Sequence, residues 1–297
     1  MGSRAKLNLV LLLVAALSLA ISAAASVEDT GEQLFQEGVR LANDRDYQGA
    51  LEHFERAMAY TPRLNVLWNI ACCHVVLGHR DLAVACLDRY MEHDLAFQES
   101  AEMQAAVADV EGEPADMPDA RRRGELWDGI AAASQAVEKG EATEAPDELR
   151  LYGVGSRSVR YKTGDNGTSP EGRRGRELNE QVIELYRSGS PEEALPFAER
   201  VAAYIANTST YHNIAVIHLS LGHRDLALDF LDLFQQRVPQ LRESAEFRLL
   251  VRDIGAAPPQ IDAATARGFV DRVDPAYDSA TSPEPRPPVR TEMGEQD

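Results

Sequence analysis

Residues 69–83 read NIACCHVVLGHRDLA and residues 213–227 read NIAVIHLSLGHRDLA, and these two stretches agree at 11 of 15 positions. They lie 144 residues apart in the chain. The same shift aligns further identical pairs outside the two stretches: Ala50-Leu51 with Ala194-Leu195, and Arg123-Gly124 with Arg267-Gly268. A single shift that matches such widely spaced segments indicates an internal duplication, and we place the copied unit at about residues 31–128.

A shorter period lies within each copy, because Ala50 precedes Ala83, and Ala194 precedes Ala227, by 33 residues. A repeat close to 34 residues is typical of helix–turn–helix units that stack into a solenoid. Small residues at such positions let two antiparallel helices approach closely, while larger apolar residues at helical spacing fill the groove between them. The sequence therefore predicts an all-α protein built from paired helices.

Residues 31–62 resemble the tetratricopeptide repeat (TPR) family, because small, apolar and aromatic residues stand at the signature spacings of that family. These residues are Leu34, Gly38, Leu41, Tyr47, Ala50, Phe54, Ala57 and Pro62. The second copy matches less closely, since Val182 replaces a small residue and Pro191 replaces an aromatic one. The resemblance implies two short helical-hairpin (solenoid) modules, over residues 31–110 and 175–256.

The segments around these modules have a different character. Residues 111–174 are expected to form a linker that contains one helix, over residues 119–139, where apolar side chains share one face. Residues 257–297 are rich in proline, alanine and acidic residues, which predicts a disordered tail. Within the modules, residues 99–110 and 243–254 are expected to supply a closing fifth helix.

Residues 1–25 have the order of a secretory signal peptide, in which a basic start is followed by an uncharged run and then by small residues. The uncharged run covers residues 7–25, which is close to the roughly 20 residues that cross a bilayer. An inner-membrane anchor formed by residues 7–25 is therefore the alternative to a cleaved signal. The scarcity of lysine beside abundant arginine and alanine suggests a GC-rich bacterial genome. We expect an exported protein of the periplasm or cell envelope, with no membrane insertion after signal cleavage.

The chain is acidic, with a formal net charge of −18 at pH 7. Such a surface repels phosphate backbones and anionic lipid headgroups unless a concentrated basic stripe is present. The two short arginine runs, over residues 121–123 and 173–176, lie among acidic residues and have no interleaved aromatic side chains for base stacking. We therefore expect a protein or peptide partner and no nucleic acid.

One motif has catalytic associations, because residues 79–83 spell HRDLA, as in the catalytic loop of protein kinases. A kinase also needs a glycine-rich phosphate loop and a strand lysine, and the sequence has neither pattern. His74 and His79 lie five residues apart across the expected turn at Gly78, whereas a two-histidine helical metal site needs a spacing of three or four. We expect His74 to be a core histidine, and we expect no enzyme activity, no cofactor and no metal.

The chain has three cysteines, an odd number for an exported protein, so at least one thiol has no intramolecular disulfide partner. Cys72, Cys73 and Cys86 align with apolar residues of the second copy, namely Val216, Ile217 and Phe230. Replacement by apolar residues indicates that the cysteines act as small hydrophobic side chains. A Cys73–Cys86 disulfide across the helix pair is the alternative.

In the TPR family, ligands lie along the concave face that the first helix of each pair forms. Carrying that face over gives a candidate partner-binding groove in each module. In the first module it comprises Phe35, Val39, Trp68, Cys72, Val75 and Val76. In the second module it comprises Asn179, Ile183, Tyr186, His212, Val216 and Leu219. The tryptophan is of the kind that anchors protein interfaces.

These features predict a non-enzymatic interaction scaffold that binds an apolar peptide or an amphipathic helix in the groove. The carboxylate clamp of the TPR family needs basic residues where Phe35 and Val39 stand, so we do not expect acidic chain termini as ligands. Two alternatives stay open. The helix at 119–139 or the other module fills the groove, or the protein has a structural, self-assembling role in which its modules dock on each other. An enzyme whose chemistry lies in residues 111–174 is the least favoured hypothesis, because that segment has neither histidine nor cysteine.

Overall fold

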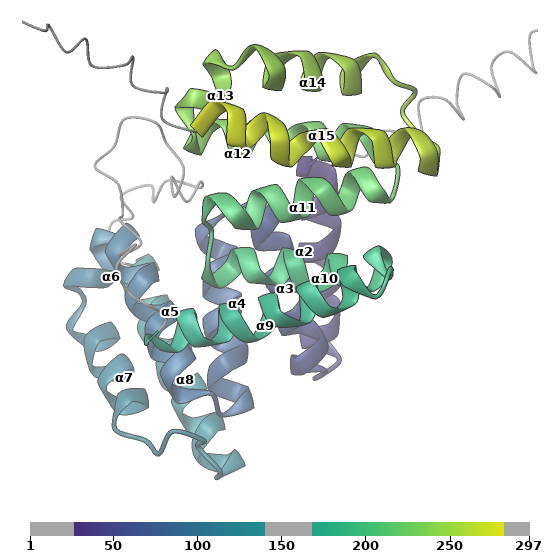
Figure 1. Ribbon diagram of the computed structural model, residues 1–297. Helices are drawn as coiled ribbons and strands as arrows, with labels where there is room; N and C mark the ends of the chain where they lie inside the picture. The colour runs from purple at the N-terminus through teal and green to yellow at the C-terminus, as the bar shows by residue number, and fades with distance from the viewer. Residues whose placement is uncertain (1–26, 140–167, 282–297) are drawn as a thin grey trace, which may run out of the picture.

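The computed structural model describes residues 27–139 and 168–281, and these residues form fourteen α-helices and no β-strand (Figure 1). We call the seven helices before the gap the first half: α2 (Val27–Asn43), α3 (Tyr47–Tyr60), α4 (Leu64–Leu77), α5 (Arg80–His93), α6 (Leu95–Glu99), α7 (Ala101–Glu111) and α8 (Ala120–Lys139). We call the seven after it the second half: α9 (Pro170–Arg187), α10 (Pro191–Tyr204), α11 (Thr208–Ser220), α12 (Arg224–Arg237), α13 (Pro239–Glu243), α14 (Ala245–Ala256) and α15 (Ala263–Thr281).

The two halves place their helices at matching points of the sequence. Helices α3 to α7 each begin 144 residues before the corresponding helices α10 to α14. The short helices α6 and α13, of five residues each, also correspond. The all-α prediction is therefore confirmed for the described residues, and the order of long and short helices is the same in both halves.

Capping side chains fix several helix starts in the same way in each half. The hydroxyl of Ser100 accepts a hydrogen bond from the backbone N–H of Met103 at the start of α7. The hydroxyl of Ser244 does the same for the N–H of Phe247 at the start of α14. Such a cap satisfies one of the N–H groups that the first helical turn leaves without an intrahelical partner.

Two glycines allow the turns that follow α4 and α11. Gly78 has a φ of 86° and Gly222 a φ of 77°, both in the left-handed region that favours glycine. A β-carbon at Gly78 would lie 2.7 Å from the carbonyl oxygen of Asp116, and one at Gly222 would lie 2.4 Å from that of Ile261. The turns therefore need glycine for two reasons. Their φ angles are positive, and the segments just before α8 and α15 pass too close to leave room for a β-carbon.

Neighbouring helices pack in pairs within each half. The pairs are α2 with α3, α4 with α5 and α7 with α8, followed by α9 with α10, α11 with α12 and α14 with α15. Helix α8 also packs along α4, and α15 packs along α11. The core between the pairs is apolar, with Phe54 and Leu67 buried in the first half and Phe230 and Phe247 in the second. Gly38 of α2 lets the Phe54 ring approach, because a β-carbon there would lie 2.7 Å from it.

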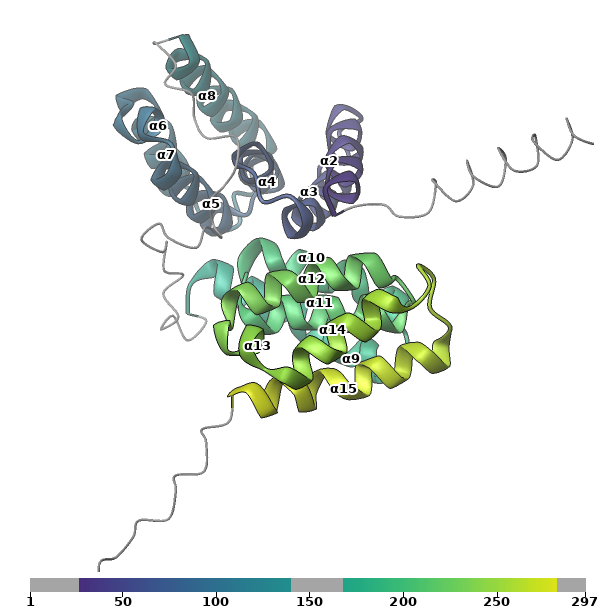
Figure 2. The ribbon, with the colours of Figure 1, turned by 90° about the horizontal axis from the view of Figure 1, so that it is seen from above.

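The two halves pack against each other through α3 and α10, with a smaller contact between α5 and α9. Figure 2 shows α3 at the edge of the first half that faces the second, and α10 at the opposing edge. The buried apolar side chains of the two halves form one continuous cluster. The two halves of the described chain are therefore in direct contact.

Helix α15 corrects the prediction of a disordered tail over residues 257–297, because residues 263–281 are helical. The Asp262 carboxylate accepts hydrogen bonds from the first backbone N–H groups of this helix. Its apolar side chains, among them Ala266 and Val273, are buried where α15 packs on α11, α13 and α14. Apolar spacing thus outweighs the proline-rich and acidic composition of this region. Residues 282–297 lie outside the described residues.

The predicted linker needs a similar correction at its end. Helix α8 occupies the position expected for the helix at 119–139, whereas α9 begins at Pro170, five residues before the expected module boundary. Ser169 caps α9 and proline occupies its first position, where no intrahelical N–H is needed. The signal-peptide and anchor predictions for residues 1–25 fall outside the described residues. Among the helices that are described, none is long and apolar enough to cross a bilayer.

Candidate functional site

The groove predicted in the first half lies on α2 and α4, and part of it faces the interior. Cys72 and Val75 are buried, with Val75 fully enclosed. Phe35 and Val39 are half-buried on α2, and the Phe35 ring lies 5.6 Å from that of Phe54. The structure therefore does not offer Cys72 and Val75 to a partner, which corrects their assignment to the groove.

Trp68, the predicted anchor, packs inside its own half. Its indole lies 5.1 Å from the ring of Tyr90 on α5 and 5.7 Å from that of Phe97 on α6. The side chain is half-buried in this aromatic group. Three aromatic rings at such distances stabilise the junction of α4, α5 and α6.

Helix α8 lies against α4, beside Val76, the last predicted groove residue of the first half. The guanidinium of Arg123 donates from Nε to the carbonyl oxygen of Val76 at 2.8 Å. It also donates from Nη1 to the carbonyl oxygen of Met117 at 2.5 Å. The helix expected at 119–139 therefore covers part of the α4 face.

The corresponding groove of the second half, on α9 and α11, is more open. Ile183 is 38% exposed, while Tyr186, Val216 and the ring of His212 are half-buried. His212 faces α15, where its Nε2 lies 2.8 Å from a carboxylate oxygen of Asp274.

The remaining predicted residues of this groove lie as follows. Leu219 is fully buried, so its assignment to the groove is also corrected. Asn179 is half-buried on α9 and accepts a hydrogen bond of 3.5 Å from Asn213 on α11. This hydrogen bond links α9 to α11.

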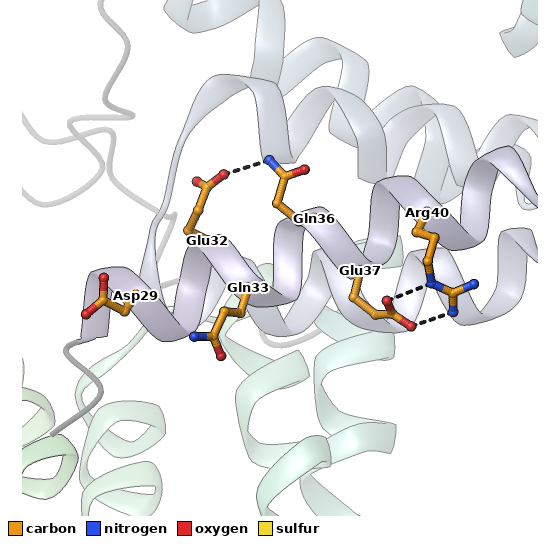
Figure 3. A pocket seen from close by; sticks show the side chains of 6 residues that line it. All are labelled: Asp29, Glu32, Gln33, Gln36, Glu37 and Arg40. Carbon is orange, nitrogen blue, oxygen red and sulfur yellow. Dashed lines mark hydrogen bonds and ion pairs between the residues drawn. The ribbon is translucent and has the colours of Figure 1, made fainter. Parts of the chain in front are cut away.

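A shallow depression of about 500 Å³ lies on the outer face of α2 (Figure 3). Six polar side chains line it: Asp29, Glu32, Gln33, Gln36, Glu37 and Arg40. Figure 3 shows hydrogen bonds along the helix, from Gln36 to Glu32 and from Arg40 to Glu37. These lining residues all belong to one helix, so the depression is a polar helix face and not an enclosed binding site.

A group of buried polar side chains joins α3 to α10, and we call it the interface cluster. Glu55 of α3 is fully buried. Its carboxylate accepts a hydrogen bond from Nε of Arg200 at 2.5 Å and another from the hydroxyl of Tyr204. Both donors belong to α10, so the carboxylate of one half is satisfied entirely by groups of the other.

The reciprocal contacts start from α10. Glu199 is 1% exposed, and its carboxylate accepts hydrogen bonds from Nε of Arg56 at 2.5 Å and from the hydroxyl of Tyr60. Glu199, Arg200 and Tyr204 each lie 144 positions after Glu55, Arg56 and Tyr60, respectively. The cluster thus consists of two equivalent carboxylate–arginine–tyrosine groups, each shared between the halves.

A pair of histidines extends each group toward the surface. Nε2 of His74 lies 2.9 Å from the hydroxyl of Tyr204, and its Nδ1 lies 3.1 Å from Nδ1 of His79. His74 is fully buried, as expected for a core histidine, while His79 is exposed. A chain of polar groups therefore runs from Glu55 through Tyr204 and the two histidines to solvent.

The second half repeats this arrangement. Nε2 of His218 lies 3.2 Å from the hydroxyl of Tyr60, and its Nδ1 lies 3.3 Å from Nδ1 of His223. The ring of Phe230 stacks on His218 at 5.5 Å. Each histidine pair lies in one of the two repeated stretches, residues 69–83 and 213–227, and the left-handed glycine between the two histidines folds the second back toward the first.

Burial controls the protonation of the cluster. It lowers the pKa of His74 well below its usual value and that of His218 to about 3, because the protonated ring would lose its contact with water. The neighbouring histidine of each pair lowers these pKa values further. Burial also raises the pKa of Tyr60 and Tyr204 well above the usual value. At neutral pH the interior histidines are therefore neutral and both tyrosines keep their protons.

The two carboxylates experience opposing effects. Burial raises the pKa of Glu55 and of Glu199, whereas the adjacent arginine and tyrosine of the other half lower it. Two carboxylates and two arginines bring balanced charges into the interface. Paired and hydrogen-bonded charges of this kind are tolerated away from water, whereas single ones are not.

The arrangement of the cluster is that of a structural joint. Its carboxylates and arginines already bind one another, and among its six residues and the four histidines that extend it only His79 is exposed. Over the described ranges, no three side chains of histidine, cysteine, aspartate or glutamate lie close enough to hold a metal ion.

Sequence reasoning missed the interface cluster, although a signal for it exists. Residues 55–60 read ERAMAY and residues 199–204 read ERVAAY, so the glutamate, the arginine and the tyrosine all recur after 144 positions. Charged residues that recur on the buried side of a helix point to a shared polar interface.

The three cysteines are free and buried. Burial raises the pKa of Cys73 to about 12, and those of Cys72 and Cys86 are raised as well. The alternative Cys73–Cys86 disulfide is not formed in this structure. A thiol kept in this apolar surrounding is a poor nucleophile.

Comparison of the chain with protein-family models, with curated proteins and with solved structures finds no match.

Proposed function

We propose that this chain is an exported, non-enzymatic interaction scaffold with two TPR-like modules that arose by duplication, and that it binds an amphipathic helix on the face of α9 and α11. The observation that carries this proposal is the exposed Ile183 beside the half-buried Tyr186 and Val216.

We call these three residues the strip; Ile183 and Tyr186 belong to α9, and Val216 belongs to α11. Tyr186 follows Ile183 by three positions on α9, so the two share one face. The Tyr186 hydroxyl lies 2.9 Å from the hydroxyl of Ser220 on α11, and Ser220 in turn donates to the carbonyl oxygen of Val216 at 2.9 Å. The Tyr186 side chain is therefore held against α11, which reduces the ordering that ligand binding would require of it.

The same place in the first half is less suitable. The counterpart of Ile183 is Val39, which is half-buried, and that of Val216 is Cys72, which is buried. Trp68 contributes to the α4–α5–α6 junction instead. We therefore assign partner binding to the second half.

Arg187 is exposed beside two acidic residues near Ile183, so the overall charge of the chain carries more weight for the class of partner. Glu180 and Glu184 are exposed on either side of Ile183 in the sequence of α9. The whole chain carries a formal charge of −18. A helix with leucine-like residues on one face and lysine or arginine at its edges would match both features.

The test uses the full chain and a defined probe, a fluorescein-labelled synthetic helix of leucine and lysine. Fluorescence anisotropy should show binding to the wild type, and Ile183→Asp should weaken it by about tenfold or more. Leu249→Asp is the matched control, because Leu249 is 44% exposed on α14, away from the strip. Failure of the wild type to bind, or equal weakening by both variants, would contradict the proposal.

A purely structural protein, in which the two modules dock on each other and no further partner binds, is the second candidate function. The buried interface cluster favours it, because that cluster already uses the polar groups of α3 and α10. Absence of probe binding together with normal thermal stability would favour this candidate over the scaffold.

Export is part of the proposal and rests on the order of residues 1–25. Mass spectrometry of the protein from the native cell envelope should show a mature chain that lacks this segment. A mature protein that begins at residue 1 and stays with the membrane fraction would instead favour the anchor.

A further inference from the structure

We propose that His79 and Arg174 form an acid-sensitive switch between the two halves, in which a proton taken up by His79 sets a second positive charge against Arg174 where α5 meets α9. This inference does not depend on the Ile183 strip.

The hydrogen bonds of the first histidine pair fix where a proton can enter. The Tyr204 hydroxyl donates to Glu55, so it accepts from Nε2–H of His74 at 2.9 Å. With its proton on Nε2, His74 presents a bare Nδ1, which accepts from Nδ1–H of His79 at 3.1 Å. The basic nitrogen of the pair is therefore Nε2 of His79, and His79 is exposed whereas His74 is buried.

The pair accepts one proton without rearrangement and excludes a second. A proton that binds Nε2 of His79 leaves the hydrogen bond between the rings in place, because Nδ1 of His79 keeps its own proton. A further proton on Nδ1 of His74 would set two N–H groups against each other at 3.1 Å. Acid therefore acts on this pair through His79 first.

Arg174 brings a positive charge to this pair from the other half. It belongs to α9, whose beginning contacts α5 (Figure 1). A salt bridge of 3.0 Å between Arg89 of α5 and Glu171 of α9 holds the two helices together. Arg174 follows Glu171 by three positions, so both side chains lie on the same side of α9. The charge of Arg174 consequently acts across the contact between the halves.

The other charged groups around the pair leave this positive charge in excess. Three carboxylates near the pair are each bonded to an arginine: Glu55 to Arg200, Asp81 to Arg80 and Glu171 to Arg89. Arg123 of α8, beside Gly78, binds two backbone carbonyl groups. Arg174 lies 3.6 Å from Glu177, whose side chain is 64% exposed, so that this ion pair offsets its charge only weakly.

The second half offers an internal comparison, because the duplicated histidine pair has different charged neighbours there. The position equivalent to Arg174 is occupied by Thr30, which has no charge. The charged group that acts on His223 is instead the carboxylate of Glu192 on α10, and the equivalent of Glu192 in the first half is Gln48. The two outer histidines therefore differ in the sign of one neighbouring charge.

These charges act in opposite directions on the two pKa values. Burial lowers the pKa of His79, and Arg174 lowers it further. Burial also lowers the pKa of His223, but Glu192 raises it. His223 should therefore take up its proton at a higher pH than His79.

The sign of the effect on stability follows from the lowered pKa of His79. In the unfolded chain a histidine has a pKa of about 6.5, so below that pH the unfolded chain takes up a proton that the folded one does not. The stability from this residue is complete above about pH 6.5 and is lost as the pH falls, by up to about tenfold in the unfolding equilibrium constant per pH unit. Because Arg174 belongs to the other half, its share of this loss opposes the docking of the halves.

The first test measures the titration of both outer histidines in the full chain, labelled with ¹⁵N-histidine, by long-range proton–nitrogen NMR. The variants His79→Gln and His223→Gln assign the signals. We expect neutral His79 to carry its proton on Nδ1 and to titrate at a lower pH than His223. A neutral His79 with its proton on Nε2, or the reverse order of titration, would overturn the proposal.

The second test changes the neighbouring charges and leaves the hydrogen-bonded chain intact. Arg174→Gln should raise the titration midpoint of His79, leave that of His223 in place and reduce the loss of stability in acid, measured by urea denaturation. Arg174→Lys keeps the charge and should titrate as the wild type does. Glu192→Gln is the matched control of opposite sign, and it should lower the midpoint of His223.

The two arginine variants separate a switch from a purely structural role of Arg174. An unchanged His79 midpoint in Arg174→Gln, or an equal shift in Arg174→Gln and Arg174→Lys, would overturn the proposal. A loss of stability in Arg174→Gln that is the same at every pH would also overturn it, because such a loss would come from packing and not from the charge facing His79.

Discussion

Glu55 and Arg200 form a salt bridge of 2.5 Å between α3 and α10 although they lie 145 positions apart, and both side chains are buried. The equivalent bridge between Glu199 and Arg56, also 2.5 Å long, lies beside it. Neither glutamate has access to water, so each depends on the arginine and tyrosine of the opposite half. The stability of the whole protein is thereby tied to the docking of its halves.

Removal of one partner from this cluster should be strongly destabilising. Glu55→Ala leaves Arg200 and the Tyr204 hydroxyl without their buried acceptor, and we expect the free energy of unfolding to fall by about 3–5 kcal/mol. Urea denaturation followed by circular dichroism measures this change. Glu37→Ala is the control, because Glu37 pairs with Arg40 on the exposed face of α2. An equal free energy of unfolding for the two variants would show that the buried salt bridge stabilises the protein no more than the exposed one.

Acid should destabilise the protein through His218. Its folded-state pKa is lowered to about 3, so below pH 6.5 the unfolded chain takes up a proton that the folded one does not. Stability from this residue is complete above pH 6.5 and is lost as the pH falls toward 3, by about 1.4 kcal/mol per pH unit. Between pH 6.5 and 5 the loss is about 2 kcal/mol. Urea titrations at several pH values should show a shallower slope for His218→Gln, and an unchanged slope would contradict the assignment.

Two glycines with the same backbone angle should respond differently to alanine. Gly189 has a φ of 85° and open space around its absent side chain, so Gly189→Ala should cost only the left-handed strain, about 1 kcal/mol. In Gly222→Ala the new β-carbon would also meet the carbonyl oxygen of Ile261, so a loss of about 3 kcal/mol or more is expected. Thermal melting of the two variants compares them directly, and a similar loss in both would show that the segment before α15 can move aside.

The three thiols should be unreactive in the native protein. Cys72, Cys73 and Cys86 are buried and form no disulfide in the structure. Burial raises the pKa of each thiol, so little thiolate is available to attack a reagent. Ellman's reagent should detect no thiol in buffer and three in urea under non-reducing conditions. Detection of one thiol in urea would instead indicate that a disulfide forms in solution.

The helical pairing could be predicted from the sequence, because it depends on local patterns. The 33-residue spacing of small residues and the left-handed turn at Gly78 each concern residues close along the chain. The helix at 119–139 followed from its apolar face in the same way. The composition of residues 257–297 predicts a disordered tail, whereas the apolar spacing within residues 263–281 is that of the helix α15.

The candidate site was predicted less well, since periodicity indicates which side of a helix is buried but not what buries it. Cys72, Val75 and Leu219 stand at positions that face a ligand in the TPR family, yet here they are buried in the apolar core. The interface cluster joins residues about 145 positions apart. No local pattern reports such a contact, and only comparison of the two ERxxxY segments could have suggested it.

The distance along the chain between the two sides of the α3–α10 joint also bears on how the protein reaches this state. Most helix pairs join sequence neighbours and can form early and quickly. The contact between α3 and α10 can form only after both helices have formed within their own halves. We therefore expect its salt bridges to be absent from the rate-limiting barrier of folding. Weakening them should leave the refolding rate nearly unchanged and accelerate unfolding, so that the lifetime of the assembled protein is set by the last contact it makes.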